Sequence, residues 1–428
     1  MLEALTDDPE QPLSAMIEVA DRCNEVCVHC YQVQGQKGEL GTEDWKAILD
    51  DLADLGVLFL TVSGGEATLR RDLLELLAYA RQKRFAVKLY TNGLSMSADL
   101  ARALAELAIQ EVQISLYSPR AEVHDWVTRV PRSWERAVAG ARHLVREGIP
   151  VVLKTPLMSV NVDDIDAYIA LAAAVGADYS FDPHLDPRED GDRDPQRLGV
   201  PRDKHLALLR NPAIAPAATR APEERRERRV CGACRGAVHI EANGEMRPCT
   251  QLDVPVGHAR TDGVGRAWRE NDAARALRAL TWNDLHGCRD CDLQPYCHRC
   301  FANARTEGGD ALGPYEGACQ RALLQYELVE GVAPAVLGDR RVGPYRQAAA
   351  GAFRPIADRL AARDHELRAR LGWVRRPAQD ATGPAVSPGD LVQIRRPGAR
   401  RAADEQVPGR RDDDRRVDRG RSTGRALP

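Results

Sequence analysis

The chain has 428 residues, of which 43% are hydrophobic and 29% charged, and a net charge of −3, which is an ordinary globular composition. It contains no apolar run near the roughly 18 residues of a membrane-spanning helix. Its acidic first twelve residues do not resemble a signal peptide. We therefore expect a cytoplasmic protein without a membrane partner, and the length predicts two or three domains.

The charge is unevenly distributed along the chain. Residues 331–428 contain 21 arginines and 12 acidic residues, a net charge of +9, while the remainder carries −12. An acidic body argues against a nucleic-acid partner. We expect residues 331–376 to form a partly helical extension, with a helix over 354–371. Residues 377–428 have the composition of a disordered, solvated tail, and a basic arm for an anionic partner is the alternative.

Residues 1–185 alternate short β-branched or apolar runs with amphipathic stretches, which predicts parallel βα units. The expected strands are 15–20, 58–62, 86–90, 111–116, 151–157 and 179–182. The expected helices are 42–55, 72–83, 98–107, 133–147 and 162–175. On pattern alone this is an α/β fold, either an open six-stranded barrel or a doubly wound sheet. In both folds the site lies at the C-terminal ends of the strands.

The pattern changes after residue 185. We expect residues 186–229 to be a linker with a short helix around 203–209. Residues 230–330 have many cysteines and few periodic segments, so metal ligation must supply much of the stability of this small domain. Asn243-Gly244 predicts a hairpin turn between two short strands.

Eleven cysteines in a chain without an export signal favour metal binding over disulfides. Three of them, Cys23, Cys27 and Cys30, follow the first expected strand with spacings of three and two residues. Thiolates spaced in this way can bind three irons of a [4Fe–4S] cluster and leave the fourth iron open. A zinc loop and buried structural cysteines are the alternatives.

The second expected strand ends in Gly64-Gly65-Glu66. Such glycines let a ligand approach the backbone, and the Glu66 carboxylate could pair with an ammonium group, although a plain turn is the usual meaning. Together with the three cysteines, this motif resembles the radical S-adenosylmethionine (SAM) enzymes. The resemblance covers residues 12–185 and implies a partial (β/α)6 TIM-like barrel. It departs from the family at Ala67, where proline is usual.

The resemblance also implies an activity. A reduced cluster bound by the three cysteines would cleave SAM to methionine and a 5′-deoxyadenosyl radical, which abstracts hydrogen from a substrate. A reductant such as flavodoxin or ferredoxin would supply the electron. The residues implied to contact SAM are His29, Gly64, Gly65, Glu66, Asn92 and Ser115. No catalytic acid or base is indicated.

The other eight cysteines lie between Cys231 and Cys319, and their spacing resembles the SPASM extension of radical SAM enzymes. One spacing departs from that pattern, because two residues rather than three separate Cys297 from Cys300. The resemblance implies two auxiliary [4Fe–4S] clusters. One would be bound by Cys231, Cys234, Cys249 and Cys300, and the other by Cys288, Cys291, Cys297 and Cys319. Two zinc knuckles are the alternative.

Members with a SPASM extension mostly act on peptides. The resemblance therefore implies a ribosomally synthesised precursor peptide as partner, and a cross-link, thioether or oxidation as product. The first strand begins at Ala15, so we expect no N-terminal winged-helix domain, and leader recognition could need a separate protein. Thr250 follows Cys249 where sulfatase maturases have aspartate, which counts against that activity.

Three alternatives remain open from the sequence. One is a radical SAM enzyme for a small molecule such as a tetrapyrrole, and another is a sulfatase-maturase-like protein modifier. The third is a non-enzymatic Fe–S or zinc protein for electron transfer or structure. His124 and Trp126 lie in a segment similar to peptide-modifying members, but we expect them to pack a loop over the barrel.

Overall fold

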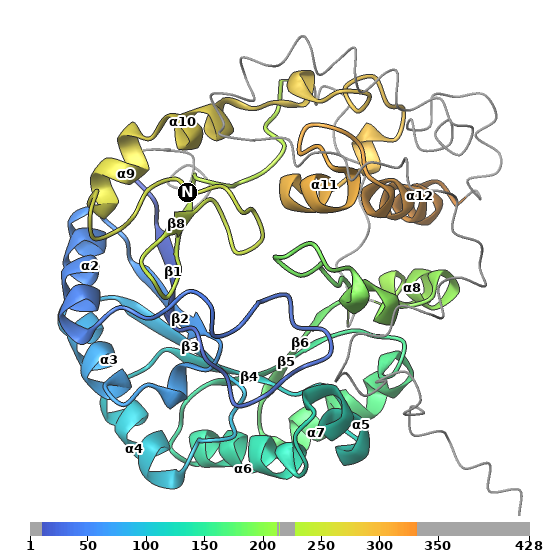
Figure 1. The fold of residues 1–428 in the computed structure, drawn as a ribbon. Helices are drawn as coiled ribbons and strands as arrows, with labels where there is room; N and C mark the ends of the chain where they lie inside the picture. The colour runs from blue at the N-terminus through green and yellow to red at the C-terminus, as the bar shows by residue number, and fades with distance from the viewer. Residues whose placement is uncertain (1–10, 212–213, 215–226, 332–428) are drawn as a thin grey trace, which may run out of the picture. The chain divides into compact units, whose positions relative to one another are not determined.

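The structure is a computed structural model that describes residues 11–211, 214 and 227–331. The helix expected over 354–371 and the tail lie outside the described residues. In the described part of the chain, eight strands form one sheet in the order β6-β5-β4-β3-β2-β1-β7-β8 (Figure 1). The strands are β1 (Ser14–Ala20), β2 (Phe59–Gly64), β3 (Ala86–Thr91), β4 (Glu111–Ser115), β5 (Val151–Pro156), β6 (Asp178–Asp182), β7 (Ala237–Ile240) and β8 (Met246–Arg247).

The first six strands are parallel and lie side by side in chain order. A doubly wound sheet would interrupt this order with a crossover, so the open barrel is confirmed and the doubly wound alternative is wrong. The helices of the barrel are α2 (Thr42–Asp54), α3 (Leu73–Gln82), α4 (Ala98–Glu106), α5 (Ala121–Thr128), α6 (Ser133–Arg146) and α7 (Ile165–Val175). All six expected strands and five expected helices are present.

The helices bury one apolar stripe against the outer face of the sheet. In α2, for example, Trp45, Ile48, Leu49 and Leu52 are buried at three- and four-residue spacing. Figure 1 shows α2, α3, α4, α6 and α7 along the outer side of the strands. The opposite face of the sheet is left for polar side chains, and this face carries the site.

The cysteine-rich region is joined to the same sheet. Strand β7 pairs in parallel with β1, and β8 returns antiparallel to β7. The expected hairpin is confirmed, with Gly244 at a φ of 92° between the two strands. Its pairing with the barrel was not predicted, because strand partners so far apart in the chain leave no local pattern. The division into domains at 185 and 230 stays a prediction.

The remaining helices are α8 (Arg202–Leu209), α9 (Val264–Glu270), α10 (Asp272–Ala279), α11 (Phe301–Gly308) and α12 (Glu316–Glu330). Helix α8 confirms the short helix expected in the linker. The loop expected around His124 is wrong, because this segment forms helix α5. Among the described residues, no helix combines the length and apolar character that crossing a bilayer requires.

Candidate functional site

A cavity of about 490 Å³ lies at the C-terminal ends of the barrel strands. All nine residues that the sequence assigned to the first cluster and to SAM line it, namely Cys23, Cys27, Cys30, His29, Gly64, Gly65, Glu66, Asn92 and Ser115. They come from the last residues of β2 and β4 and from the segments that follow β1, β2 and β3. Thr250 and Gln251 of the cysteine-rich region also line the cavity. The fold therefore brings these residues into one site.

The loop that carries the three cysteines is held from outside by helix α5. The N–H groups of Val26 and Val28 donate to the carbonyl oxygens of Thr128 and Val127, at 3.1 and 2.9 Å. The side chain of Val26 is 73% exposed, so backbone bonds rather than its apolar burial fix this part of the loop. Helix α5 thus contributes to the shape of the site.

Gly64 and Gly65 allow the segment after β2 to pack against the segment after β1. A Cβ atom at Gly64 would lie 2.4 Å from the Ala20 carbonyl oxygen, and one at Gly65 would lie 2.5 Å from that of Arg22. The Gly65 N–H donates to Ala20 at 2.7 Å, and the Glu66 N–H donates to Arg22 at 2.9 Å. The close approach of two backbones therefore explains both glycines without a ligand.

Glu66 is a fixed carboxylate in the wall of the cavity and is only 1% exposed. Its Oε1 accepts from the Thr68 backbone N–H at 2.9 Å, the Thr68 hydroxyl at 2.6 Å and the Thr91 hydroxyl at 2.7 Å. Its Oε2 accepts from the Asn92 N–H at 2.7 Å. Each oxygen of a carboxylate can accept at least two hydrogen bonds. Oε2 therefore retains capacity for one more donor, such as an ammonium group.

Asn92 connects the end of β3 to the cysteine loop. Its amide donates to the Asn24 side-chain oxygen at 2.6 Å and lies 3.9 Å from the Cys23 sulfur. Its own side-chain oxygen accepts from the Leu94 N–H at 3.0 Å. These hydrogen bonds at both ends of the side-chain amide orient Asn92 toward the loop that carries the three cysteines.

His29 and Tyr117 pack together in the cavity. Their ring centroids are 4.6 Å apart in an edge-to-face arrangement. The Nδ1 atom of His29 is buried without a hydrogen-bond partner among the described residues. Burial lowers the His29 pKa to about 4, so the imidazole is neutral. A neutral ring at this position is suited to stacking or hydrogen bonding with a heteroaromatic ligand.

His124 supports Tyr117 from behind. Its Nδ1 accepts from the Tyr117 N–H at 3.0 Å, and the two rings stack with centroids 5.4 Å apart. The His124 side chain is fully buried, and Trp126 packs against the cluster of Tyr117, Val127 and Met158. The packing role expected for these two residues is confirmed, although a helix rather than a loop carries them.

The three thiols near the cavity are unusually hard to ionise. Burial raises the pKa of Cys23 to about 12, and it also raises those of Cys27 and Cys30. Burial raises the pKa of Glu25, whose Oε2 accepts from Cys27 Sγ at 3.3 Å, to about 7. Metal ions bind thiolates and displace such protons. Three inward thiols beside an open cavity fit a cluster with one unligated iron.

The effects that the eight remaining cysteines have on one another's pKa fall within the two groups that the family resemblance implies. Burial raises the pKa of Cys249 to about 11, and the nearby Cys300 and Cys231 raise it further. Burial also raises the pKa of Cys234, and the nearby Cys249 and Cys231 raise it further. In the other group, burial raises the pKa of Cys319, and Cys288, Cys297 and Cys291 add to it. All eleven cysteines lie in the described part of the chain, and none forms a disulfide.

Arg299 is a buried cation beside both groups. It lowers the pKa of Cys231 in one group and of Cys288 in the other, opposing the larger effect of burial. Its side chain is 6% exposed, and its Nε and Nη1 atoms have no hydrogen-bond partner among the described residues. A buried guanidinium without a counter-ion is costly, so this environment fits an anionic group such as an iron–sulfur cluster.

Comparisons with known proteins agree with this geometry. Residues 17–172 match the family model of the radical SAM superfamily, and residues 231–300 match that of the SPASM iron-sulfur cluster-binding domain. The fold and the cysteine sites thus define a radical SAM enzyme. The chain belongs to the radical SAM enzymes that carry a SPASM domain, and it uses SAM and iron–sulfur clusters. The non-enzymatic alternative is wrong.

Two curated relatives and one solved structure illustrate the similarity. The chain is 26% identical to the AdoMet-dependent heme synthase of Methanosarcina barkeri, over 69% of this chain and 93% of that protein. It is 36% identical to the mycofactocin maturase MftC of Mycolicibacterium smegmatis, over 39% of this chain and 43% of that protein. Streptococcus suis SuiB bound to its precursor peptide SuiA has a similar fold, with a TM-score of 0.56, 16% identity, and coverage of 74% of this chain and 78% of SuiB.

Several residues of the site escaped the sequence analysis. Glu25, Tyr117 and Lys154 line the cavity, and Arg299 lies beside the other cysteines. Glu25 lies between Cys23 and Cys27, and Arg299 directly precedes Cys300. Their positions beside cysteines could have identified both residues from the sequence. The inward direction of Lys154 on β5 follows only from the register of the sheet, where it lies opposite Ser115.

Proposed function

We propose that the protein modifies a ribosomally synthesised precursor peptide by radical SAM chemistry. The observation that carries the proposal is the single cavity that Cys23, Cys27, Cys30 and Glu66 line together with side chains of the cysteine-rich region. Similarity to a mycofactocin maturase supports a peptide substrate. The fold shared with SuiB, which was solved with a precursor peptide, is compatible with it.

The chain's own residues have defined roles in this proposal. The three thiolates would hold the cluster, Glu66 Oε2 would accept from the SAM ammonium, and His29 would lie against the adenine. Gly64, Gly65, Asn92 and Ser115 would complete the SAM pocket. When bound, SAM and the reduced cluster supply the radical that removes hydrogen from the substrate. The surrounding side chains hold the substrate close to the reacting carbon and exclude water.

We further propose two auxiliary clusters, bound by the two groups of four cysteines, that transfer electrons to or from the substrate or support its cavity. Flavodoxin or ferredoxin would deliver the electron for SAM cleavage. A separate protein would bind the leader segment of those precursor peptides that carry one. The modification itself is a cross-link, a thioether or an oxidation.

A tetrapyrrole is the second candidate substrate, because the heme synthase of Methanosarcina barkeri aligns over nearly its whole length. The cavity gives a reason to rank it second. Among the described residues, Lys154 is the one lysine or arginine in the lining. A substrate with several carboxylates would find a single cation there, whereas a peptide backbone needs none.

The experiment is anaerobic reconstitution with iron, sulfide, SAM and reductant, followed by mass spectrometry of a co-expressed candidate peptide. We expect 5′-deoxyadenosine and a peptide mass change in the wild type. Cys27→Ala should abolish both, while Cys291→Ala should retain some SAM cleavage and lose the modified peptide. Turnover by Cys27→Ala equal to the wild type would refute the cluster assignment. SAM cleavage coupled to a tetrapyrrole but to no peptide would favour the second candidate.

A further inference from the structure

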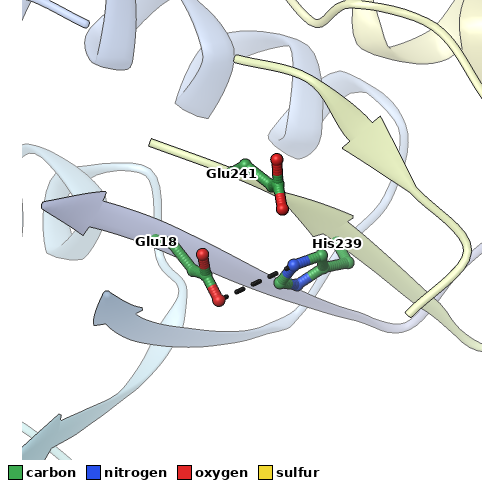
Figure 2. Close-up of side chains that lie close together, drawn as sticks. All are labelled: Glu18, His239 and Glu241. Atoms are coloured by element: carbon green, nitrogen blue, oxygen red, sulfur yellow. Dashed lines mark ion pairs between the residues drawn. The ribbon is translucent and has the colours of Figure 1, made fainter. Parts of the chain in front are cut away.

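A group of three side chains that could bind a metal, none of them a cysteine, lies on β1 and the β7 segment. Glu18 is on β1, His239 is on β7, and Glu241 directly follows β7. They are 5%, 4% and 2% exposed. Figure 2 shows the three side chains pointing toward one another from neighbouring strands, and one ligand atom from each lies within 4.8 Å of the others.

The register of the sheet explains why they meet. Met16 lies opposite His239 in the parallel pair of β1 and β7. Side chains two residues apart on a strand share a face, so Glu18 lies on the face of Met16, and Glu241 on that of His239. Met16 lines the cavity, which places the group on the inner side of the barrel.

Two atoms of the group are buried polar atoms that no protein group satisfies. These are Nδ1 of His239 and Oε2 of Glu241, neither of which has a hydrogen-bond partner among the described residues. The other His239 nitrogen is 3.8 Å from Glu18 Oε1, beyond hydrogen-bond distance. A buried polar atom without a hydrogen bond lowers the stability of the fold. Here two such atoms, from His239 and Glu241, lie close to the carboxylate of Glu18.

The charge around the group is also unbalanced. Lys37 Nζ and Arg247 Nη1 both bind the other oxygen of Glu241, Oε1, at 2.8 and 3.1 Å. The carboxylates around these two cations are those of Glu18, Glu189, Glu241, Glu245 and Asp253. Five acidic groups therefore face two basic ones. Burial raises the Glu18 pKa to about 7, and Lys37 only partly offsets this.

We propose that Glu18, His239 and Glu241 form a binding site for one divalent first-row metal ion. Two carboxylates and one imidazole are ligands that Mn²⁺, Fe²⁺ and Zn²⁺ accept. Such ions bind nitrogen and oxygen at about 2.0–2.2 Å, so small side-chain rotations bring the three atoms into range. Burial, with help from Arg247 and Lys37, lowers the His239 pKa to about 3, so a nitrogen lone pair is available.

The bound ion would add a further link between the barrel and the cysteine-rich region. Its ligands come from β1 and from the β7 segment, which also contact each other through their parallel pairing, and Glu241 binds Lys37 of the barrel. Gln32, which donates to Glu18 Oε1 at 2.8 Å, also lines the cavity. The site is therefore close to the cavity and uses no cysteine.

Mn²⁺ is the probe, because it prefers oxygen and nitrogen to thiolate and is detected by electron paramagnetic resonance. Cluster-loaded protein is treated with a chelator and titrated with MnCl₂, and the signal of free Mn²⁺ is recorded. We expect one Mn²⁺ bound per chain and a higher unfolding temperature with the ion. Wild-type protein that binds no Mn²⁺ at millimolar concentration would overturn the site.

Two variants and one control locate the ion. His239→Phe keeps an aromatic ring and removes the unpartnered Nδ1 and the 3.8 Å contact of Nε2 with Glu18. The chain should therefore fold, yet its Mn²⁺ affinity should fall at least tenfold. Glu241→Gln should have the same effect. Glu245→Gln is the matched control, because Glu245 binds Arg247 at 2.9 Å but is not a ligand. Wild-type affinity in His239→Phe, or an equal loss in Glu245→Gln, would contradict the proposal.

Discussion

The side-chain amide of Asn92 donates a hydrogen bond to the side-chain oxygen of Asn24 at 2.6 Å, across 68 positions of sequence. It joins the end of β3 to the loop that carries Cys23, Cys27 and Cys30. The same Asn92 binds Glu66 through its backbone N–H. One residue therefore couples the cluster loop to the carboxylate that we assign to SAM.

Asn24→Ala should loosen the cluster loop. It leaves the Asn92 amide with the weak Cys23 contact at 3.9 Å, and loss of one such hydrogen bond costs about 1 kcal/mol. Urea unfolding and iron content per chain measure the effect, and we expect both to fall. Asn24→Asp keeps the acceptor and is the control. Equal iron content in the alanine variant and wild type would show that the bond does not hold the loop.

Glu66→Gln should weaken SAM binding. The side chain keeps its size but loses its charge and the acceptor for the Asn92 N–H. A lost charged hydrogen bond costs about 1.5–3 kcal/mol, or roughly 10- to 150-fold in Kd. Equilibrium binding of SAM to reconstituted protein measures it. Thr68→Val removes one donor to Glu66 and keeps the carboxylate, so its Kd should change much less. Unchanged affinity in the glutamine variant would exclude the ammonium contact.

His124 should make the protein less stable in mild acid. Burial lowers its pKa from 6.5 to about 4, so the unfolded chain binds more protons between these values and stability falls as pH decreases through that window. Between pH 7.5 and 5.5 this one residue accounts for about 1 kcal/mol. Urea unfolding at both pH values compares wild type with His124→Gln, whose loss on acidification should be smaller by that amount. An identical pH dependence would contradict the role of burial.

Arg299→Met should lower the reduction potential of the auxiliary clusters that we propose. The guanidinium is buried beside both cysteine groups, and a positive charge favours the more negative reduced state. We expect a shift of at least tenfold in the reduction equilibrium, about 59 mV for one electron. Redox titration followed by electron paramagnetic resonance measures it. Arg299→Lys keeps the charge, and Arg266→Met removes an exposed one. Equal potentials in all three variants would exclude the effect.

The alternation of strands and helices, the cysteine spacings and Gly64-Gly65-Glu66, with the family resemblance that they carry, were sufficient to predict the barrel and nine residues of the cavity. These features are local, because helix periodicity, turn glycines and ligand spacing each depend on residues that are close together in the sequence. The family resemblance likewise implies two groups among the eight later cysteines, and their division into two ligand sets stays a prediction.

Contacts between distant segments could be found only in the tertiary structure. The pairing of β7 with β1, the support of the cysteine loop by α5 and the convergence of Glu18, His239 and Glu241 depend on sheet register. Register is decided by which strands become neighbours and which faces they bury, and a single sequence does not state this. The sequence thus determined the chemistry that each segment can perform, and the packing decided which segments perform it together.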